Sequence, residues 1–195
     1  ICKTFFSSTM IRNNVPHIFF LTFLFLILNI SSTLADWQPA KEGNKIILIR
    51  HSIAPGSGDP SGFQIKDCKT QRNLSKEGID QSKKIGKLFK INQIKIDQVL
   101  SSQWCRCKDT AKYAFKNYKE FSALNSTFQP PYDKNAKKQI KELKDFIQKW
   151  NGKGGNLVLV THYVIITSIT DVAPRSGEIV IIDKNFNTLS TILTN

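Results

Sequence analysis

The chain has 195 residues, of which 41% are hydrophobic, and a formal net charge of +13 at pH 7. This length and apolar content suffice for one ordinary globular core and leave little room for a second, so we expect a single domain. The basic balance favours anionic partners such as phosphorylated saccharides, lipid headgroups or nucleic acid. A solvated, lysine-rich surface is the simpler interpretation, because pairs such as Lys83-Lys84 and Lys137-Lys138 fall on predicted helix faces.

Residues 1–35 have the pattern of a secretory signal peptide. Met10-Ile11-Arg12 supplies a charged start, residues 18–28 are almost wholly apolar, and a run of small residues ends at Ala35. This pattern predicts cleavage after Ala35 and a periplasmic or secreted location. A retained membrane anchor is the alternative, but the apolar run over residues 18–30 is shorter than the roughly twenty residues that a spanning helix needs. Residues 1–9 would lie upstream of a start at Met10, and we assign them no function.

The first predicted strand covers residues 45–50 and ends at Arg50-His51. Its continuous apolar run, Ile46-Ile47-Leu48-Ile49, is typical of a strand that is buried on both faces. Residues 52–73 follow with little periodicity and contain Pro-Gly-Ser-Gly-Asp-Pro, which predicts a long loop. Loops longer than about fifteen residues are usually functional. We therefore expect this loop to form a wall of a site beside His51.

Helices and strands alternate after this loop. Ser75 is a suitable N-cap for an amphipathic helix that reaches about Lys90, in which Gly78 is expected to be a cost. Apolar periodicity predicts three further elements, a strand over residues 97–101, a helix over 104–118 and a helix over 133–150.

A second strand that ends at a histidine lies in the last quarter of the chain. Residues 157–161 form an apolar run that leads directly to His162. A short helix to about Thr170 and a hairpin of residues 177–183 and 188–193 are predicted after it. The alternation of strands with helices predicts a three-layer α/β/α sandwich with a largely parallel central sheet.

Three strand-to-helix junctions carry basic side chains: Arg50-His51, Arg106 in the turn that enters the helix after the second strand, and His162. Ligands of open parallel sheets bind outside the carboxyl ends of the strands, so these side chains are expected to face one small anion. Two guanidinium groups and two imidazoles around one point indicate a phosphate pocket.

The chemistry that fits these residues is phosphoryl transfer to histidine. A neutral His51 would attack phosphorus through one ring nitrogen while a backbone carbonyl holds the other N–H, and water would then hydrolyse the phosphohistidine. Arg50, Arg106 and His162 would hold the phosphate oxygens. We expect a small phosphorylated substrate, no nucleic acid, and neither a metal ion nor a cofactor.

A family resemblance supports this hypothesis. Arg50-His51, Leu74-Ser75-x-x-Gly78, Ser101-Ser102-x-x-x-Arg106 with Thr110-Ala111, and Thr161-His162 resemble, in this order, the motifs of the histidine phosphatase superfamily, also called phosphoglycerate-mutase-like. The resemblance implies a phosphoglycerate-mutase-like sandwich, a phospho-accepting His51, and a pocket completed by the two arginines and the second histidine. Its compact exported branch includes a lipopolysaccharide-core heptose phosphate phosphatase, which implies a phosphosugar or lipopolysaccharide-core phosphate as substrate.

The proton donor of the family has no counterpart in this chain. Some members carry a glutamate where this chain has Leu124-Asn125-Ser126, and others an aspartate where it has Tyr163. Glu178, Asp59 and Asp67 are possible substitute general acids, of which we favour Glu178 first and Asp59 next. The simpler interpretations are an exposed strand residue for Glu178, a turn residue before proline for Asp59 and an ordinary loop charge for Asp67. A substrate with a good leaving group, such as a phosphohistidine or an acyl phosphate, would need no acid.

The cysteines are consistent with an oxidising compartment. Cys68, Cys105 and Cys107 remain after the predicted cleavage, which favours one disulfide, from Cys68 to Cys105 or Cys107, and one free thiol. A Cys-x-Cys metal site is the less favoured alternative.

Two other functions remain open: one would explain the missing general acid, and the other would explain the basic surface. The first is a catalytically weak phosphate- or phosphosugar-binding protein of the same fold. The second is a basic envelope-associated module that binds anionic glycolipid through surface lysines.

Overall fold

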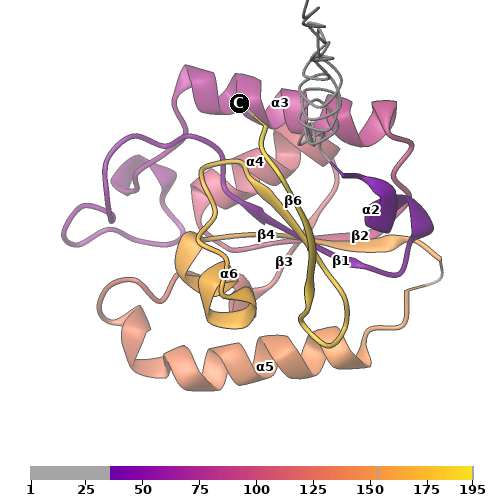
Figure 1. Cartoon of the computed structure of the whole chain (residues 1–195). Helices are drawn as coiled ribbons and strands as arrows, with labels where there is room; N and C mark the ends of the chain where they lie inside the picture. Colours follow the sequence, from indigo (N-terminus) through magenta and orange to yellow (C-terminus); the bar gives the residue numbers. More distant parts are fainter. Residues whose placement is uncertain (1–35, 153, 195) are drawn as a thin grey trace, which may run out of the picture. The chain divides into compact units, whose positions relative to one another are not determined.

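The computed structural model describes residues 36–152 and 154–194 (Figure 1). The predicted signal peptide lies outside the described residues. None of the helices that the structure describes is both long and apolar enough to cross a membrane.

Six strands form one sheet in the order β3-β2-β4-β1-β5-β6. They are β1 (Ile46–Arg50), β2 (Ile96–Ser101), β3 (Lys119–Glu120), β4 (Asn156–Thr161), β5 (Ile179–Ile182) and β6 (Thr188–Ile192). The pairs β1/β4, β2/β4 and β2/β3 are parallel, whereas β5 pairs antiparallel with both β1 and β6. The predicted largely parallel sheet and C-terminal hairpin are therefore confirmed.

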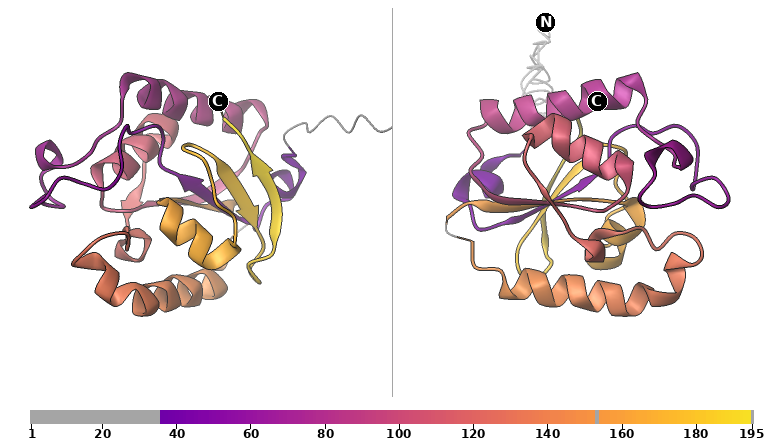
Figure 2. Two further views of the ribbon diagram at one scale, coloured as in Figure 1. Left: turned by 60° about the vertical axis from the view of Figure 1, so that its left-hand side comes forward. Right: turned by 180° about the vertical axis from the view of Figure 1, so that it is seen from behind.

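Helices cover both faces of this sheet, as Figures 1 and 2 show. The helices α3 (Lys76–Ile91) and α4 (Cys105–Phe115) lie on one face, and α5 (Ala136–Lys149) and α6 (Tyr163–Thr170) lie on the other. A short helix, α2 (Gln38–Glu42), precedes β1, and 3-10 turns η1 (Cys68–Thr70), η2 (Ser122–Leu124) and η3 (Tyr132–Asn135) lie in the connections. This arrangement is the predicted α/β/α sandwich.

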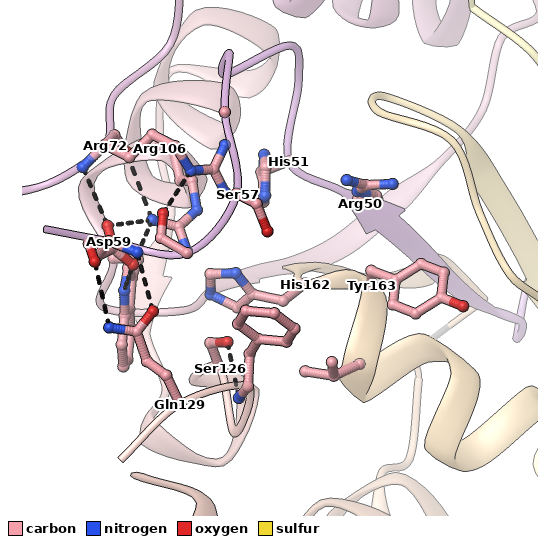
Figure 3. Close-up of a pocket in the computed structure, with 15 residues that line it drawn as sticks. Arg50, His51, Ser57, Asp59, Arg72, Arg106, Ser126, Gln129, His162 and Tyr163 are labelled. Atoms are coloured by element: carbon pink, nitrogen blue, oxygen red, sulfur yellow. Dashed lines mark hydrogen bonds and ion pairs between the residues drawn. The ribbon is translucent and has the colours of Figure 1, made fainter. Parts of the chain in front are cut away.

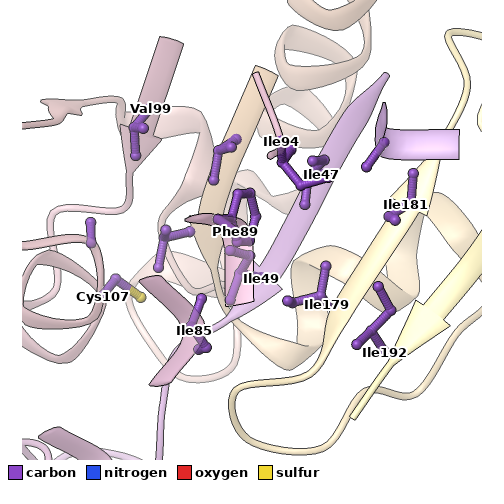
Figure 4. Packing of buried hydrophobic residues seen from close by; sticks show 14 of the residues in the cluster. Ile47, Ile49, Ile85, Phe89, Ile94, Val99, Cys107, Ile179, Ile181 and Ile192 are labelled. Atoms are coloured by element: carbon purple, nitrogen blue, oxygen red, sulfur yellow. The ribbon is translucent and has the colours of Figure 1, made fainter. Parts of the chain in front are cut away.

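The central strands β1, β4 and β5 are buried on both faces, with side chains alternating between two cores. In β1, Ile47 and Ile49 pack against α3 and α4 in the cluster of Figure 4, whereas Ile46 and Leu48 belong to the opposite cluster with α5 and α6. This alternation follows from the two-residue period of a strand. The same alternation separates the two residues at the end of β1. Arg50 lies on the face of the sheet that α6 covers, and His51 lies on the face that α4 covers.

Helix α3 begins as predicted, with Ser75 as its N-cap. The Ser75 hydroxyl accepts a hydrogen bond from the backbone N–H of Gly78 at 3.2 Å. The expectation that Gly78 is only a cost is wrong, because a Cβ at this position would overlap the carbonyl oxygen of Ile53. Glycine lets α3 approach the segment that follows His51, so this residue positions the site.

Other boundaries differ from the predictions. Residues 36–44, over which no helix is predicted, contain α2, and Trp37 at its start is buried against Phe89 with ring centroids 5.4 Å apart. The helix predicted over 104–118 ends at Phe115, because Lys116 has a φ of 69°. The helix predicted over 133–150 starts as the 3-10 turn η3 and becomes α-helical at Ala136.

Candidate active site

The two strand-end histidines lie side by side. Strands β1 and β4 are parallel neighbours with Arg50 opposite Thr161, so His51 and His162 leave the sheet at the same edge. Their ring centroids are 5.5 Å apart at an interplanar angle of 68°. Both rings line a cavity of about 310 Å³ (Figure 3), and each residue is only 3% exposed. The structure therefore brings the two histidines together as the sequence predicts.

The hydrogen bond of His51 determines its tautomer. Nδ1 lies 2.8 Å from the carbonyl oxygen of Ser52. A carbonyl only accepts, so Nδ1 carries the proton and Nε2 keeps a free lone pair. Burial, followed by the positive charge of Arg106, lowers the pKa of His51 well below its usual value. The ring is therefore neutral at physiological pH and has one nucleophilic nitrogen.

The second histidine is held by polar groups from β2 and the segment after η2. Nε2 of His162 lies 2.9 Å from the Ser102 hydroxyl, which in turn lies 3.2 Å from Oδ1 of Asn125. Burial and then Arg106 lower the pKa of His162 well below its usual value, so this ring is neutral too. Oδ1 of Asn125 only accepts, so the Ser102 hydroxyl donates to Asn125, and Nε2 of His162 carries the ring proton and donates to Ser102. The proton would lie on Nδ1 only if the Ser102 hydroxyl turned from Asn125 to Nε2.

Arg106 is the second residue of α4, and its side chain is buried. Helix α4 has no side-chain cap from Trp104, but Oε1 of Gln71 accepts from the backbone N–H of Cys105 at 3.0 Å. Within the described residues, all hydrogen bonds of the Arg106 guanidinium go through NH1, and its buried Nε has no partner. The remaining donors are available to an anion.

Asp59 is the partner of Arg106. NH1 of Arg106 lies 2.8 and 3.0 Å from the two carboxylate oxygens, and both side chains are 3% exposed. Burial alone would raise the pKa of Asp59, but the hydrogen bond and charge of Arg106 outweigh it and hold this pKa below its usual value. Asp59 lines the cavity as an ionised group, so the structure does not place a protonated acid at this position.

Glu178, the other predicted acid, does not line the cavity. It lies just before β5, and its Oε2 accepts from the backbone N–H of Arg175 at 2.7 Å. The residue is 8% exposed, so the prediction of an exposed strand residue is wrong as well. Its carboxylate closes a local turn.

Arg50 lines the cavity from the α6 side. Its NH1 donates to the carbonyl of Pro174 at 2.9 Å, and its guanidinium carbon lies 5.6 Å from the centre of the Tyr163 ring. The cation–π contact and the carbonyl hold the guanidinium at the rim of the cavity. Arg50, His51, Arg106, His162 and Asp59 therefore all meet at one cavity.

A third arginine, Arg72, also lines the cavity, although the sequence favours capping and loop contacts for this residue over contact with a substrate. Its Nε donates to the carbonyl of Gly58 at 2.7 Å, and NH1 donates to the carbonyl of Ala54. Arg72 lines the cavity and ties the long loop to the segment that enters α3. In the sequence, Arg72 is a basic residue shortly before a helix N-cap. A residue in such a position more commonly makes only loop contacts, so the pattern does not single it out as a site residue.

The rim of the cavity carries exposed aromatic side chains. Phe128 is 58% exposed and Tyr163 is 42% exposed, and both line the cavity, with Trp104 buried deeper. A ligand that enters would contact apolar rings at the mouth and cations inside. Within the described residues, no group of three or more His, Cys, Asp or Glu side chains could hold a metal ion.

The predicted disulfide forms between Cys68 and Cys105. It links η1 in the long loop to the first residue of α4, next to Arg106. Cys107 is free and buried, with Sγ 3.4 Å from Nε2 of His162. Burial raises the pKa of Cys107 to about 12, so this residue is a thiol at physiological pH.

Comparison with known proteins identifies the fold. No family model and no curated protein matches the chain. Among solved structures, the protein histidine phosphatase SixA complexed with tungstate has a TM-score of 0.53 and 14% identity, covering 77% of this chain and 97% of that one. A phosphoglycerate mutase from Thermus thermophilus has a TM-score of 0.54 and 15% identity, covering 76% of this chain and 98% of that one. The chain has the phosphoglycerate-mutase-like fold that these proteins share.

Proposed function

We propose that this chain is a histidine phosphatase that hydrolyses a phosphomonoester through a phosphohistidine on His51. The observation that carries the proposal is the pair of buried, neutral histidines at the carboxyl ends of adjacent parallel strands, surrounded by Arg50, Arg72 and Arg106. Structural neighbours that include a protein histidine phosphatase and a phosphoglycerate mutase support a reaction of this class.

The first step forms a bond between Nε2 of His51 and phosphorus. The Nε2 lone pair attacks in line, the bond to the leaving group breaks, and the leaving group takes the electron pair. The carbonyl of Ser52 holds the Nδ1–H throughout and keeps the reactive nitrogen directed into the cavity. In the second step, water attacks phosphorus, and His51 is released with inorganic phosphate.

The cations and His162 stabilise charge in both steps. Phosphoryl transfer spreads negative charge over the equatorial oxygens, and preorganised donors directed at these oxygens lower the free energy of the transition state. Unpaired N–H groups of Arg50 and Arg106 are such donors. His162 becomes one when the Ser102 hydroxyl turns from Asn125 to Nε2 and the ring proton moves to Nδ1. The steps as written use only groups of this chain, water and the substrate.

We also propose that the leaving group departs without help from a carboxylic acid. Asp59, the one carboxyl group among the residues that line the described cavity, is ionised, and Glu178 lies outside that cavity. Among phosphomonoesters, aryl phosphates are favoured for this reason. Phosphohistidine and acyl phosphates, which are not esters, also have leaving groups that need no acid. The sugar of a phosphosugar leaves as an alkoxide, so hydrolysis of such a substrate would lack the rate factor of about 10² to 10⁴ that a general acid typically contributes.

Export to the periplasm or the outside of the cell is part of the proposal. The signal-like pattern of residues 1–35 and the pairing of Cys68 with Cys105 both support it, because structural disulfides are uncommon in reducing compartments. A substrate in these compartments would reach the enzyme without crossing a membrane.

A phosphate-release assay tests the proposal. The purified protein would be assayed with a phosphohistidine peptide, acetyl phosphate, an aryl phosphate and a hexose phosphate, in parallel with His51→Ala and with Lys137→Ala, an exposed control. We expect release that His51→Ala abolishes and Lys137→Ala leaves unchanged, with the hexose phosphate slowest.

Other outcomes distinguish the alternatives. Persistent release by His51→Ala would refute the mechanism. Phosphate binding without release would favour a phosphate- or phosphosugar-binding protein. Salt-sensitive binding to glycolipid vesicles that survives His51→Ala would favour the envelope-associated module.

A further inference from the structure

We propose that Asp59 is a positioning residue for Arg106, which orients the guanidinium toward the reacting phosphate. This role rests on the proposed function and replaces the general-acid role that the sequence suggested for this residue. Four contacts hold the Asp59 carboxylate, its backbone is attached to a neighbouring segment, and donors of Arg106 remain free.

The Asp59 carboxylate is fully occupied by donors. Besides its two contacts with NH1 of Arg106, it accepts from Nε1 of Trp104 and from the backbone N–H of Arg72, each at 3.0 Å. All of these partners are N–H groups, so a carboxylate suits the position and a protonated acid would lose at least one acceptor. Such a group is built to remain an anion.

The contact with Asp59 leaves the rest of the guanidinium free for a ligand. Figure 3 shows Arg106 between Asp59 on one side and the rings of His51 and His162 on the other. Asp59 and the carbonyl of Arg72 accept hydrogen bonds from NH1 of Arg106, whereas its Nε and NH2 have no acceptor among the described residues. Fixing NH1 therefore fixes the direction in which the remaining donors point.

The backbone around Asp59 is also anchored to Gln129, another residue that lines the cavity. Its N–H donates to Oε1 of Gln129 at 2.9 Å, and Gln129 Nε2 lies 3.5 Å from its carbonyl oxygen. Gly58 has a φ of 66°, and a Cβ there would come within 2.9 Å of the same Oε1. The loop thus holds the carboxylate in one place although the backbone around Asp59 forms no helix or strand.

The charge of Asp59 also matches the pocket to a dianion. Arg50, Arg72 and Arg106 contribute three positive charges, the two histidines are neutral, and Asp59 contributes one negative charge. The resulting charge of +2 equals that needed to neutralise a phosphate dianion. Four hydrogen bonds and a fixed charge balance make orientation of Arg106 the consistent interpretation.

The test is a double-mutant cycle of Asp59→Asn and Arg106→Ala. In Asp59→Asn the amide N–H₂ faces a donor, so Arg106 loses its orientation, and we expect kcat/KM to fall about 10- to 100-fold. The loss should be the same for nitrophenyl, phenyl and acetyl phosphate. After Arg106→Ala, Asp59→Asn should change kcat/KM by less than about threefold, because the positioned group is gone. Asp67→Asn, in the same loop but outside the cavity, is the matched control.

A second variant addresses loss of folding. Trp104→Phe keeps a ring but removes the Nε1–H that holds Oδ2 of Asp59, so kcat/KM should fall about 3- to 10-fold for every leaving group. Calorimetric binding of orthovanadate, a mimic of five-coordinate phosphorus, is a readout independent of turnover. We expect both Asp59→Asn and Trp104→Phe to bind vanadate more weakly than the wild type and Asp67→Asn.

The outcomes separate this inference from the proposed function. Losses confined to phenyl phosphate would make Asp59 a general acid, and tighter vanadate binding by Asp59→Asn would make it an inhibitory anion; either result overturns the inference while the function stands. Independent, multiplicative effects of Asp59→Asn and Arg106→Ala would also overturn it. Vanadate binding that weakens in a protein without phosphatase activity would refute the function and keep the positioning role.

Discussion

His51 and His162 stand edge to face with ring centroids 5.5 Å apart, and neither ring has an acidic side chain as a hydrogen-bond partner among the residues that the structure describes. A carboxylate would favour the charged ring, so its absence from these contacts, together with burial and the nearby arginines, keeps both rings neutral. The neutral state makes His51 nucleophilic, and it also links the stability of the fold to pH.

The stability of the protein should decrease as the pH falls below about 6.5, the usual pKa of histidine. The native pKa values of both rings are lowered, so in this window the unfolded chain binds protons that the native state does not. The free energy of unfolding should fall by up to about 1.4 kcal/mol per pH unit for each ring. Urea unfolding from pH 8 to pH 5 measures this slope.

The control for this prediction is the double variant His51→Gln, His162→Gln. It lacks both titrating rings, so its free energy of unfolding should depend less on pH over the same window. Parallel curves for the variant and the wild type would show that the rings are not the source of the slope.

Gly78→Ala should destabilise the protein. In an exposed helix interior this change is usually favourable because it raises helix propensity. Here the added methyl group would overlap the Ile53 carbonyl, and a forced shift of this kind costs about 1 to 3 kcal/mol. Activity should fall too, since Ile53 is two residues from His51. Lys87→Ala, on the exposed side of α3, is the control, and equal unfolding midpoints for the two variants would contradict the prediction.

Removing the disulfide should lower stability. The Cys68–Cys105 link closes a segment with a sequence separation of 37 residues. The chain-entropy model gives about 4 kcal/mol for a loop of this length, an upper estimate for Cys68→Ala, Cys105→Ala. Chemical unfolding with and without a reductant measures this loss. The reductant should lower the free energy of unfolding of the wild type and leave that of the variant unchanged. A loss below about 1 kcal/mol would mean that the reduced chain holds the loop equally well.

Chelators should leave phosphate release unchanged. Arg50, Arg72 and Arg106 supply the positive charges that face the cavity, and the proposed steps do not use a metal ion. The assay is phosphate release after dialysis against EDTA, followed by addition of magnesium or zinc. Loss of activity that either ion restores would show that the cations of the pocket have been misinterpreted.

The main elements of the fold could be predicted because each depends on local patterns. The apolar runs before His51 and His162 specify buried strands, and Ser75 specifies a helix start through its own hydrogen bond to Gly78. Parallel strands place their carboxyl ends at one edge, so the meeting of His51, Arg106 and His162 also followed from the order of the elements.

Only the tertiary structure decided the roles of the residues in irregular segments. Asp59 and Arg106 are 47 residues apart, and the long loop has no periodicity that would indicate where its carboxylate lies. Contacts within irregular segments also decide the roles of Glu178, whose carboxylate accepts from the backbone N–H of Arg175, and of Arg72. Gly78 lies in a helix, but its need for a bare Cα depends on the backbone of Ile53 in the long loop. Sequence patterns report which face of an element is buried, whereas contacts between loops depend on the path of the chain through space, and this path is set by the packing of the whole domain.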